Sequence, residues 1–496
     1  MRSRRVRLAL LIFLGVPSAA MAACQEPPPA AGAWYPTVAP YEGGSGSERD
    51  HLFAAACTAF ETNSAAGGPA VDVRRAPDLP GLYNAVTRAR DQIFALGGAY
   101  GKIDAKNGPY VVALDANSLR RRWTTRLPGM AAEDWNYPGV LGVHRNGDLY
   151  AIYSHRLARL DPATGAVKGV LELPTNQSPA DVSYNGFVLL HDGMLVAKSI
   201  HRAPGCTAPD FQAFLQCRTA GVAASNLVVI DPERMTILDQ AVAEEHIRFR
   251  VTVAPGEGED LVYLPGETRI HRYRWRDGRL RLDTGWRADY LEPGQTAGTA
   301  VAVMGDWIVV QTNGIPSNTP MSIVAVSQRD AARKFRLSPF ADATRHGSFI
   351  PSLPTVDADR RRIFTFDGFV GEAAAIDFDE ASGLHVAWRV PQRSFAFSVL
   401  VGPPNARVWI GTDLNRWLSN AVFSLFGFDA LRWLSARTSP SREDIVWREA
   451  ATGREIARAE KAAAVGGGAP VPGFGGALLL PDLSDGSLAV IDRRAR

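Results

Sequence analysis

Two stretches of this chain decide its fold: residues 134–152 read DWNYPGVLGVHRNGDLYAI, and residues 181–199 read DVSYNGFVLLHDGMLVAKS. Each begins as a polar, aromatic loop, continues into an apolar strand, turns at a polar segment and returns as a second β-branched strand. The same pattern recurs in residues 294–312, 347–366, 394–412 and 473–490. A unit that recurs at a spacing of tens of residues is typical of a repeat architecture.

Each unit also carries a turn between its third and fourth strands, and many of these turns begin with aspartate, as at Asp115, Asp161 and Asp231. An aspartate carboxylate at that position accepts the backbone N–H two residues further on, which stabilises the turn. We count eight units, which start near residues 82, 137, 184, 247, 295, 348, 395 and 471.

A four-stranded sheet cannot bury both of its faces alone, but sheets stacked radially around an axis bury each other. The sequence therefore predicts an all-β chain that forms a single β-propeller of eight four-stranded blades, with seven blades as the alternative. The last unit ends without a fourth strand. Val71-Asp72-Val73 is the only short β-like run before the first unit, so we expect an N-terminal strand to close the ring.

The first 22 residues read as a signal peptide, with Arg2, Arg4 and Arg5 before a short apolar run and Ala20-Met21-Ala22 as the cleavage site. A twin-arginine signal is the alternative. We expect a periplasmic or secreted protein, with an N-terminal arm over residues 23–81 and the propeller over residues 82–496. Removing residues 1–22 takes away four arginines and no acid, which lowers the formal net charge from +3 to −1. That charge gives no reason to expect a nucleic-acid partner.

The four cysteines are Cys24, Cys57, Cys206 and Cys217. An even count in an exported chain predicts two disulfides. Of the three pairings we favour Cys206–Cys217, which closes a local loop, together with Cys24–Cys57, which ties down the arm. A lipid anchor at Cys24 is the rival reading, and it leaves Cys57 without a partner.

The Asp-x-x-Thr-Gly-like turns, followed by a strand that contains Trp123 or Trp388, resemble the repeats of the pyrroloquinoline-quinone-type propellers. The resemblance covers residues 82–494 and is one of repeats only. It implies a superfamily that includes periplasmic dehydrogenases and also assembly scaffolds without a cofactor. Its dehydrogenases usually carry two adjacent cysteines over the quinone, and no Cys-Cys pair occurs here.

In a propeller the loops that lead into the first strands meet at one mouth of the central channel. We therefore predict a small-molecule site there. The predicted catalytic or metal-binding carboxylates are Glu133, Asp134 and Asp181. The predicted ligand-binding residues are Trp135, Asn136, Tyr137, Ser183, Tyr184, Asn185, Gln295, Thr296, His346 and Ser348. The alternative is that these polar side chains only cap loop backbone.

No specific motif identifies a cofactor; Ca²⁺, through oxygen ligands, and a quinone are the two candidates. His144 and His191 fall in turns on the opposite side of the ring, where we expect solvated side chains. At most two histidines face the channel, which disfavours a four-histidine iron centre.

Residues 413–443 form an insertion that is very apolar for a loop, and we expect it to contain helix. Three interpretations remain open: a lid over the channel, a contact for a protein or a membrane surface, and a plug packed on the propeller. Two functions follow from the sequence as a whole. One is a ligand-binding propeller that is also an oxidoreductase or a hydrolase. The other is a non-catalytic binding or assembly propeller that acts through its surface.

Overall fold

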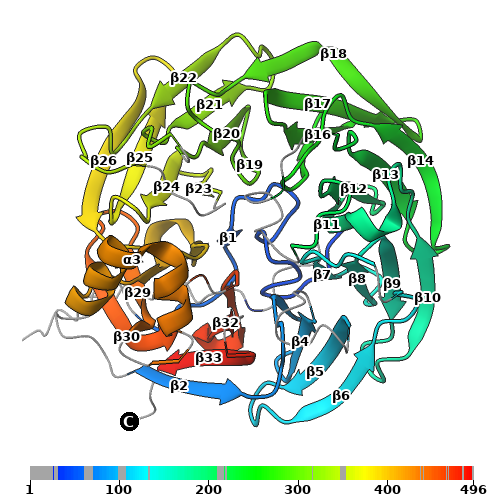
Figure 1. Ribbon diagram of the computed structural model, residues 1–496, viewed down its shortest axis with the longest axis horizontal. Coiled ribbons are helices and arrows are strands. Elements are labelled where there is room, and N and C mark those ends of the chain that lie inside the picture. Colours follow the sequence, from blue (N-terminus) through cyan, green and yellow to red (C-terminus); the bar gives the residue numbers. More distant parts are fainter. Residues whose placement is uncertain are drawn as a thin grey trace, which may run out of the picture.

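The computed structural model shows a closed ring of sheets around a central axis (Figure 1). The residues that it describes are 26, 32–60, 71–98, 108–131, 134–208, 217, 221–314, 317–346, 353–435, 437–438, 441–464, 466, 468–482 and 485–493. Their strands form eight sheets, which confirms the prediction of an eight-bladed all-β propeller.

The first four blades follow one another along the chain. Blade 1 contains β3 (Asn84–Thr87), β4 (Gln92–Gly97), β5 (Tyr110–Asp115) and β6 (Arg121–Arg126). Blade 2 contains β7 (Leu141–Val143), β8 (Leu149–Tyr153), β9 (Arg156–Leu160) and β10 (Val167–Glu172). Blade 3 contains β11 (Val182–Leu189), β12 (Leu195–His201), β13 (Asn226–Asp231) and β14 (Thr236–Val242). Blade 4 contains β15 (Thr252–Pro255), β16 (Asp260–Pro265), β17 (Arg269–Arg276) and β18 (Arg279–Asp289).

The remaining blades repeat this order and then recruit the N-terminus. Blade 5 contains β19 (Val301–Met304), β20 (Trp307–Gln311), β21 (Ile323–Ser327) and β22 (Lys334–Leu337). Blade 6 contains β23 (Thr355–Asp357), β24 (Arg362–Asp367), β25 (Glu372–Asp379) and β26 (Gly383–Pro391). Blade 7 contains β27 (Val399–Val401), β28 (Val408–Asp413), β29 (Glu443–Glu449) and β30 (Glu455–Ala463), and β1 (Leu52–Phe53) joins its inner edge. Blade 8 contains β31 (Val471–Pro472), β32 (Leu478–Asp482), β33 (Ser487–Arg493) and β2 (Val71–Ala76).

Strand β2 completes the last blade from the other end of the chain. It pairs antiparallel with β33 along its whole length, from Val71 opposite Arg493 to Ala76 opposite Leu488. An ion pair of 2.8 Å between Arg74 and Asp492 crosses the same ladder. The closing strand predicted at Val71–Val73 is therefore confirmed, and the ring is sealed by joining the first and last parts of the fold.

The burial of the strands follows their distance from the axis. The inner and middle strands are buried on both faces, as β8, β11 and β20 show. The outermost strands alternate between exposed and half-buried residues, as in β10 and β14. Each middle strand packs between two neighbouring sheets, and this requires the continuous apolar runs that the sequence displays.

The N-terminal arm, residues 32–60, lies in the centre of the ring against the innermost strands (Figure 1). Its carbonyl oxygens accept hydrogen bonds from strand N–H groups in six blades. The donor–acceptor pairs are Thr87–Ala39, Val143–Pro40, Val253–Ser47, Val303–Glu48, Val356–Asp50 and Leu400–His51, all at 2.8–3.1 Å. In blade 3 the Ser47 hydroxyl donates to the Leu189 carbonyl instead, at 2.6 Å. The arm thus binds the inner edges of blades 1 to 7.

The arm also corrects one prediction. His144 is buried, with 2% of its surface exposed, because Trp34 of the arm pairs with it in a β-bridge. The His144 ring lies 3.0 Å from the Gly193 carbonyl oxygen. The expectation that His144 is a solvated turn residue is therefore wrong, whereas the His191 side chain is 44% exposed.

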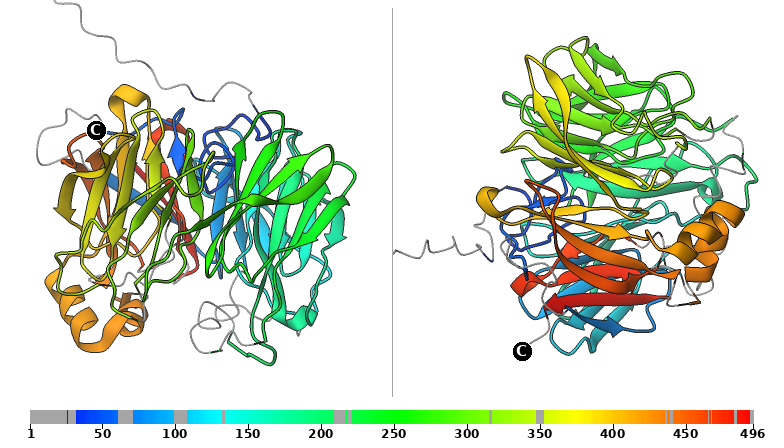
Figure 2. Two further views of the ribbon diagram at one scale, coloured as in Figure 1. Left: turned by 90° about the horizontal axis from the view of Figure 1, so that it is seen from above. Right: turned by 90° about the vertical axis from the view of Figure 1, so that its left-hand side faces the viewer.

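Two faces of the ring follow from strand direction. The arm meets the first strands near their C-terminal ends, so we call that side the arm face. The loops that lead into the first strands, and those that join second to third strands, lie on the other side, which we call the loop face. Figure 2 shows the arm and helix α3 (Trp417–Ser435), which lies between β28 and β29, at opposite ends of the ring.

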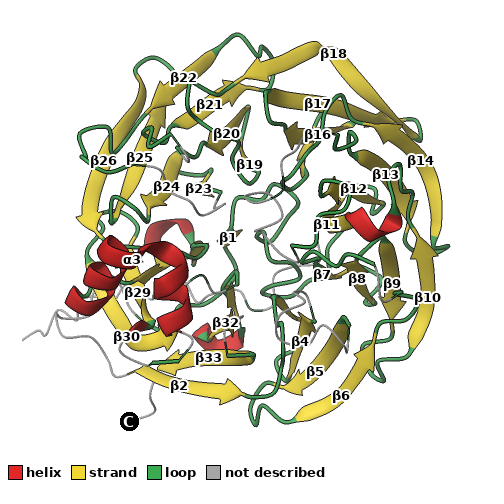
Figure 3. Cartoon of the chain, in the orientation of Figure 1, coloured by secondary structure: helices red, strands yellow, loops and turns green. Residues whose placement is uncertain are grey.

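Helix α3 is the main helical element (Figure 3), and it lies in the 413–443 insertion, where the sequence predicts helix. The other helical elements are the short 3-10 turns Pro179–Asp181, Pro404–Ala406 and Phe474–Gly476. Among the described residues, none of the helices has the length and apolar character needed to cross a membrane.

A buried carboxyl lies at the base of this insertion. Glu443, the first residue of β29, is fully buried and accepts hydrogen bonds from the Thr412 hydroxyl at 2.7 Å and the Phe395 N–H at 3.1 Å. Burial raises the pKa of Glu443 to about 8. An unfolded glutamate has a pKa near 4.5. At a pH between 4.5 and about 8 the carboxyl is therefore protonated in the folded state and ionised in the unfolded state, so unfolding releases a proton.

We expect the pH dependence of stability to reflect this carboxyl. The folded-state pKa is raised, so the contribution of Glu443 is complete below pH 4.5 and is lost as the pH rises to about 8. Thermal unfolding of the wild type and of Glu443→Gln, measured from pH 5 to pH 9, reports this pH-dependent contribution of Glu443 to stability. The melting temperature of the wild type should fall relative to that of the variant across this range. A difference between the two that does not change with pH would contradict the assignment.

Candidate functional site

The residues predicted to line the channel mouth lie on the loop face, in the loops that lead into β7 and β11. The side chain of Asp134 is buried, and its Oδ2 lies 2.8 Å from Nη1 of Arg156 on β9. The same oxygen accepts the Ala131 N–H at 2.9 Å. Arg156 also contacts the exposed Glu172 at 2.7 Å. Glu133 lies outside the described residues, so the structure places only one of the two adjacent carboxylates.

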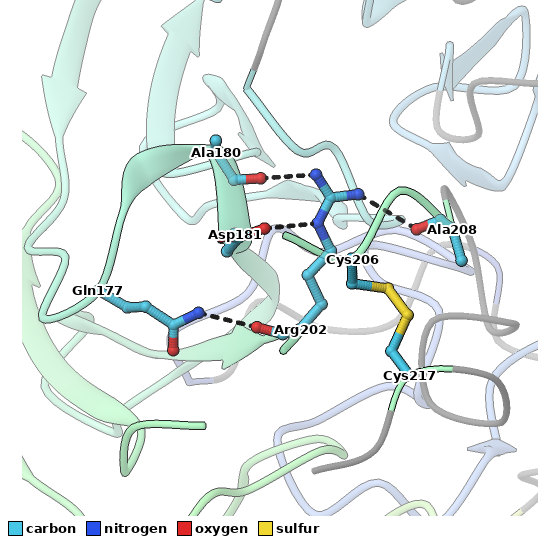
Figure 4. The surroundings of a disulfide bond; sticks show 7 residues. All are labelled: Gln177, Ala180, Asp181, Arg202, Cys206, Ala208 and Cys217. Atoms are coloured by element: carbon cyan, nitrogen blue, oxygen red, sulfur yellow. Dashed lines mark hydrogen bonds and ion pairs between the residues drawn. A yellow bond between two sulfur atoms is a disulfide. The ribbon is translucent and has the colours of Figure 1, made fainter. Parts of the chain in front are cut away.

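Asp181 holds a second arginine (Figure 4). Its Oδ1 accepts a hydrogen bond of 2.9 Å from Nε of Arg202, which follows β12. The Arg202 guanidinium also donates to the carbonyls of Ala180 at 2.8 Å and Ala208 at 3.2 Å. It lies 5.3 Å from the centre of the Trp135 ring. Arg202 therefore links the two predicted loops, and both predicted carboxylates are neutralised by arginine.

The disulfide predicted between Cys206 and Cys217 is present beside this arginine (Figure 4). It closes an eleven-residue separation in the loop between β12 and β13, next to the buried face of Trp135. Cys57 is also disulfide-bonded, whereas Cys24, its predicted partner, lies outside the described residues. A disulfide in this loop suits an oxidising compartment.

The aromatic and amide residues of the two loops bond mainly to backbone. Asn136 donates to the Gly98 carbonyl and accepts the Ser154 N–H, both at 2.9 Å. Ser183 accepts the Tyr137 N–H at 3.2 Å. Tyr184 is buried and donates to the Pro174 carbonyl at 2.7 Å, and burial raises its pKa above the ordinary value. These contacts position the mouth of the channel.

Blade 5 contributes a similar polar network. Gln295 donates to the Pro320 carbonyl at 2.8 Å and to the Ser322 hydroxyl at 2.9 Å. Thr296 forms a β-bridge with Asn313. The N–H of His346 donates to Asn318 at 2.9 Å. Ser348 lies outside the described residues. For all these residues the predicted binding role stays a prediction.

Deeper in the ring the structure brings together residues that sequence reasoning missed. We call Tyr41, Glu42, Arg49, Tyr83, Lys198 and Arg250 the central cluster. Arg250 lies just before β15, and its Nη1 contacts Glu42 Oε1 at 2.8 Å and the Asn185 carbonyl at 2.5 Å. Its other terminal nitrogen donates to the Tyr83 hydroxyl.

Gly186, next to Asn185, makes room for this arginine. Its φ is +153°, and a Cβ at this position would lie 2.8 Å from Nη1 of Arg250. The backbone of β11 can therefore approach the guanidinium only because residue 186 is glycine.

The arm supplies a second guanidinium. Arg49 is 1% exposed and donates from Nε to the Val251 carbonyl at 2.6 Å. Its Nη1 is 3.9 Å from Glu42 Oε1, and the guanidinium lies 5.0 Å from the centre of the Tyr41 ring. Within the described residues, Arg49 Nη2 and the Tyr41 hydroxyl have no hydrogen-bond partner. Asn185 Oδ1, which belongs to the predicted ligand-binding residues, is also buried and has no hydrogen-bond partner among the described residues.

Lys198, on β12, completes the cluster. It is 1% exposed and donates from Nζ to the Ile247 carbonyl at 2.6 Å. Burial, with smaller effects from Arg250 and Arg49, lowers the pKa of Lys198 well below its ordinary value. In the described part of the chain, the ion pairs of these three cationic side chains involve one carboxylate, that of Glu42. Burying cations without matching anions is costly.

The residues present do not match the cofactors considered from sequence. The described part of the chain has no group of three or more histidine, cysteine, aspartate or glutamate side chains placed to hold a metal. The sequence has no adjacent cysteine pair, and Cys57, Cys206 and Cys217 are bonded in disulfides. We therefore derive no step through a quinone.

The fold defines the class of protein: the chain is an eight-bladed β-propeller. It is similar to quinohemoprotein alcohol dehydrogenase from Comamonas testosteroni, with a TM-score of 0.57 and 9% identity over 92% of this chain and 81% of that one. It is also similar to quinohemoprotein alcohol dehydrogenase ADHIIG from Pseudomonas putida HK5, with a TM-score of 0.57 and 10% identity over 96% of this chain and 82% of that one. For BamB from Moraxella catarrhalis the TM-score is 0.47 and the identity is 13%, over 86% of this chain and 99% of that one.

The two dehydrogenase structures confirm the resemblance predicted from the Asp-initiated turns, and at these identities the likeness concerns the fold alone. No protein-family model matches the chain, and no curated protein matches its sequence.

A double-mutant cycle tests whether Asp134 is a structural partner of Arg156. Asp134→Ala leaves a buried guanidinium without its inner carboxylate, and we expect a loss of about 3 kcal/mol in the free energy of unfolding. Asp134→Ala/Arg156→Met should recover part of that loss. Glu172→Ala removes the exposed partner of the same arginine and should cost less than about 1 kcal/mol. Urea denaturation measures these three variants, the single variant Arg156→Met that completes the cycle, and the wild type. A neutral Asp134→Ala would contradict the pairing.

Proposed function

We propose that this protein is an exported propeller that binds a small anionic solute in its central channel. The observation that carries the proposal is the excess of buried cationic side chains in the central cluster. Arg49 and Arg250 share the carboxylate of Glu42, and Lys198 donates to a backbone carbonyl. Arg49 Nη2 and the Tyr41 hydroxyl have no hydrogen-bond partner among the described residues.

The chemistry of the cluster favours an oxyanion. Guanidinium groups donate to carboxylate, sulfate and phosphate oxygens in a fixed planar geometry. The Tyr41 hydroxyl and the Lys198 ammonium add donors of the same kind, and Asn185 adds an amide next to Arg250. An anion among these groups would offset the charge excess and raise the lowered pKa of Lys198.

The position of the arm gives the proposed site an orientation. Residues 32–60 cover the arm face, with Trp34, Tyr41 and Phe53 almost completely buried. We therefore propose that a ligand enters from the loop face, past Trp135 and Asn185. In this proposal the ion pairs of Asp134 with Arg156 and of Asp181 with Arg202 fix the loops at the channel mouth. The predicted ligand-binding residues line the path from the loop face to the central cluster.

A thermal-shift titration tests the proposal. A ligand that binds only the folded state raises the melting temperature with its concentration. Sodium sulfate, sodium phosphate and sodium acetate are the probes, with sodium chloride at matched ionic strength. We expect a saturable rise with at least one oxyanion in the wild type. Lys198→Met and Tyr41→Phe should weaken the binding by roughly tenfold or more, as expected for the loss of one charge-assisted hydrogen bond.

Lys168→Met is the matched control, because Lys168 is a surface cation that pairs with Asp148 at 2.7 Å, outside the central cluster. This variant should respond to the probes as the wild type does. The proposal fails if the chloride series gives the same shift, or if all three variants respond alike.

A further inference from the structure

Helix α3 carries an exposed apolar surface that the channel does not use. Trp417 is 83% exposed, Leu425 74%, Phe426 70% and Trp433 59%. We call these four residues and Leu418, which is 38% exposed, the α3 surface. Elsewhere in the described chain, large exposed apolar residues lie on the outer strands of separate blades, at Val167, Val170, Leu238, Val242 and Val386. Several large apolar side chains exposed on one short helical element indicate an interaction site.

The opposite side of α3 is anchored to the propeller. Phe423 and Leu431 are buried and pack with Phe395 and Leu414. Arg345 and Arg393 lie over the Phe423 ring, at 4.5 and 5.1 Å from its centre. The apolar residues of the helix are thus divided into a buried set and an outward set, so the α3 surface is held outward by packing.

A kink at Gly427 shapes this surface. Its φ of +79° interrupts the helix between Phe426 and Phe428, and glycine adopts such a conformation at little cost. Each of the two resulting segments has at most ten residues and is at most about 15 Å long, roughly half the thickness of a bilayer's hydrocarbon core. Figure 2 shows α3 projecting from the loop face of the ring.

The charges around the α3 surface are mainly positive. Residues 416–438 contain three arginines and a single acid, Asp429. Arg416 is paired with Asp444, whereas Arg432 and Arg437 have no ion pair with an acid among the described residues. The Arg437 guanidinium lies 4.3 Å from the centre of the Trp433 ring. Tryptophan and leucine beside arginine suit the boundary between acyl chains and anionic headgroups, where the rings are partly buried and the cations meet phosphate.

We infer that α3 binds the surface of a phospholipid bilayer that contains anionic lipids. Trp417, Leu425, Phe426 and Trp433 enter the headgroup region, and Arg432 and Arg437 contact lipid phosphates. A projecting helical element with exposed apolar side chains and neighbouring arginines fits this occupant, because a bilayer surface can deform around it. The propeller would then lie with its loop face, and the mouth of its channel, toward the membrane.

Vesicle co-sedimentation tests the inference. The vesicles contain phosphatidylcholine alone, or phosphatidylcholine and phosphatidylglycerol in equal parts. The wild type should sediment with the anionic vesicles, more weakly with the neutral ones, and less as salt is raised. Leu425→Ser/Phe426→Ser should reduce binding to anionic vesicles roughly tenfold or more, since it removes two largely exposed apolar side chains. Arg432→Gln/Arg437→Gln should abolish the preference for anionic lipid.

The matched control is Leu238→Ser/Val242→Ser, which removes two exposed apolar residues from β14, 41% and 59% exposed. It should bind as the wild type does. All variants keep the same N-terminal segment, so a difference in vesicle binding cannot come from that segment. Equal melting temperatures show that each variant is folded. The inference is overturned if wild-type protein ignores both kinds of vesicle, or if the α3 variant and the control bind equally. Lys198→Met should bind vesicles as the wild type does. A failure of the membrane inference can therefore be distinguished from a failure of the proposed anion site in the channel.

Discussion

The inner edges of the blades impose the constraint on which the rest of this structure depends. The first strand of each blade is the edge of a sheet, with backbone N–H groups directed toward the axis of the ring. Such groups need partners wherever water is excluded. Here the carbonyls of Ala39, Pro40, Ser47, Glu48, Asp50 and His51 supply them, one blade after another. Because the arm follows the ring in this way, its own side chains are held at fixed positions around the axis.

That constraint explains why a cluster of charges exists in the middle of an apolar fold. Glu42 and Arg49 flank the part of the arm that turns within the ring, and blades 1, 3 and 4 contribute Tyr83, Lys198 and Arg250. None of these side chains could be held so far from solvent by a single blade. The arm and the ring therefore build the cluster together, while the loop face is organised by Arg156 and Arg202.

The sequence predicts the ring well because its signals are local and repeated. Alternating strands, Asp-initiated turns and an unpaired last unit are sufficient to predict eight blades and the closing strand at Val71–Val73. The course of the arm could not be predicted, since residues 33–60 have neither periodicity nor a repeat partner. The prediction for His144 was wrong for that reason. Asp134 and Asp181 could be placed at the mouth, but their partners Arg156 and Arg202 follow 22 and 21 residues later, where no motif connects them.

The pairing of β2 with β33 has a consequence for how the chain reaches this state. Residues 71–76 leave the ribosome among the first segments, and residues 487–493 among the last. The closing contact joins residues as far apart as Arg74 and Asp492, which are 418 positions apart in sequence, so the ring is sealed only after both strands have been made. A contact between strands so far apart in sequence forms slowly, and the edges of β2 and β33 stay unpaired until it does.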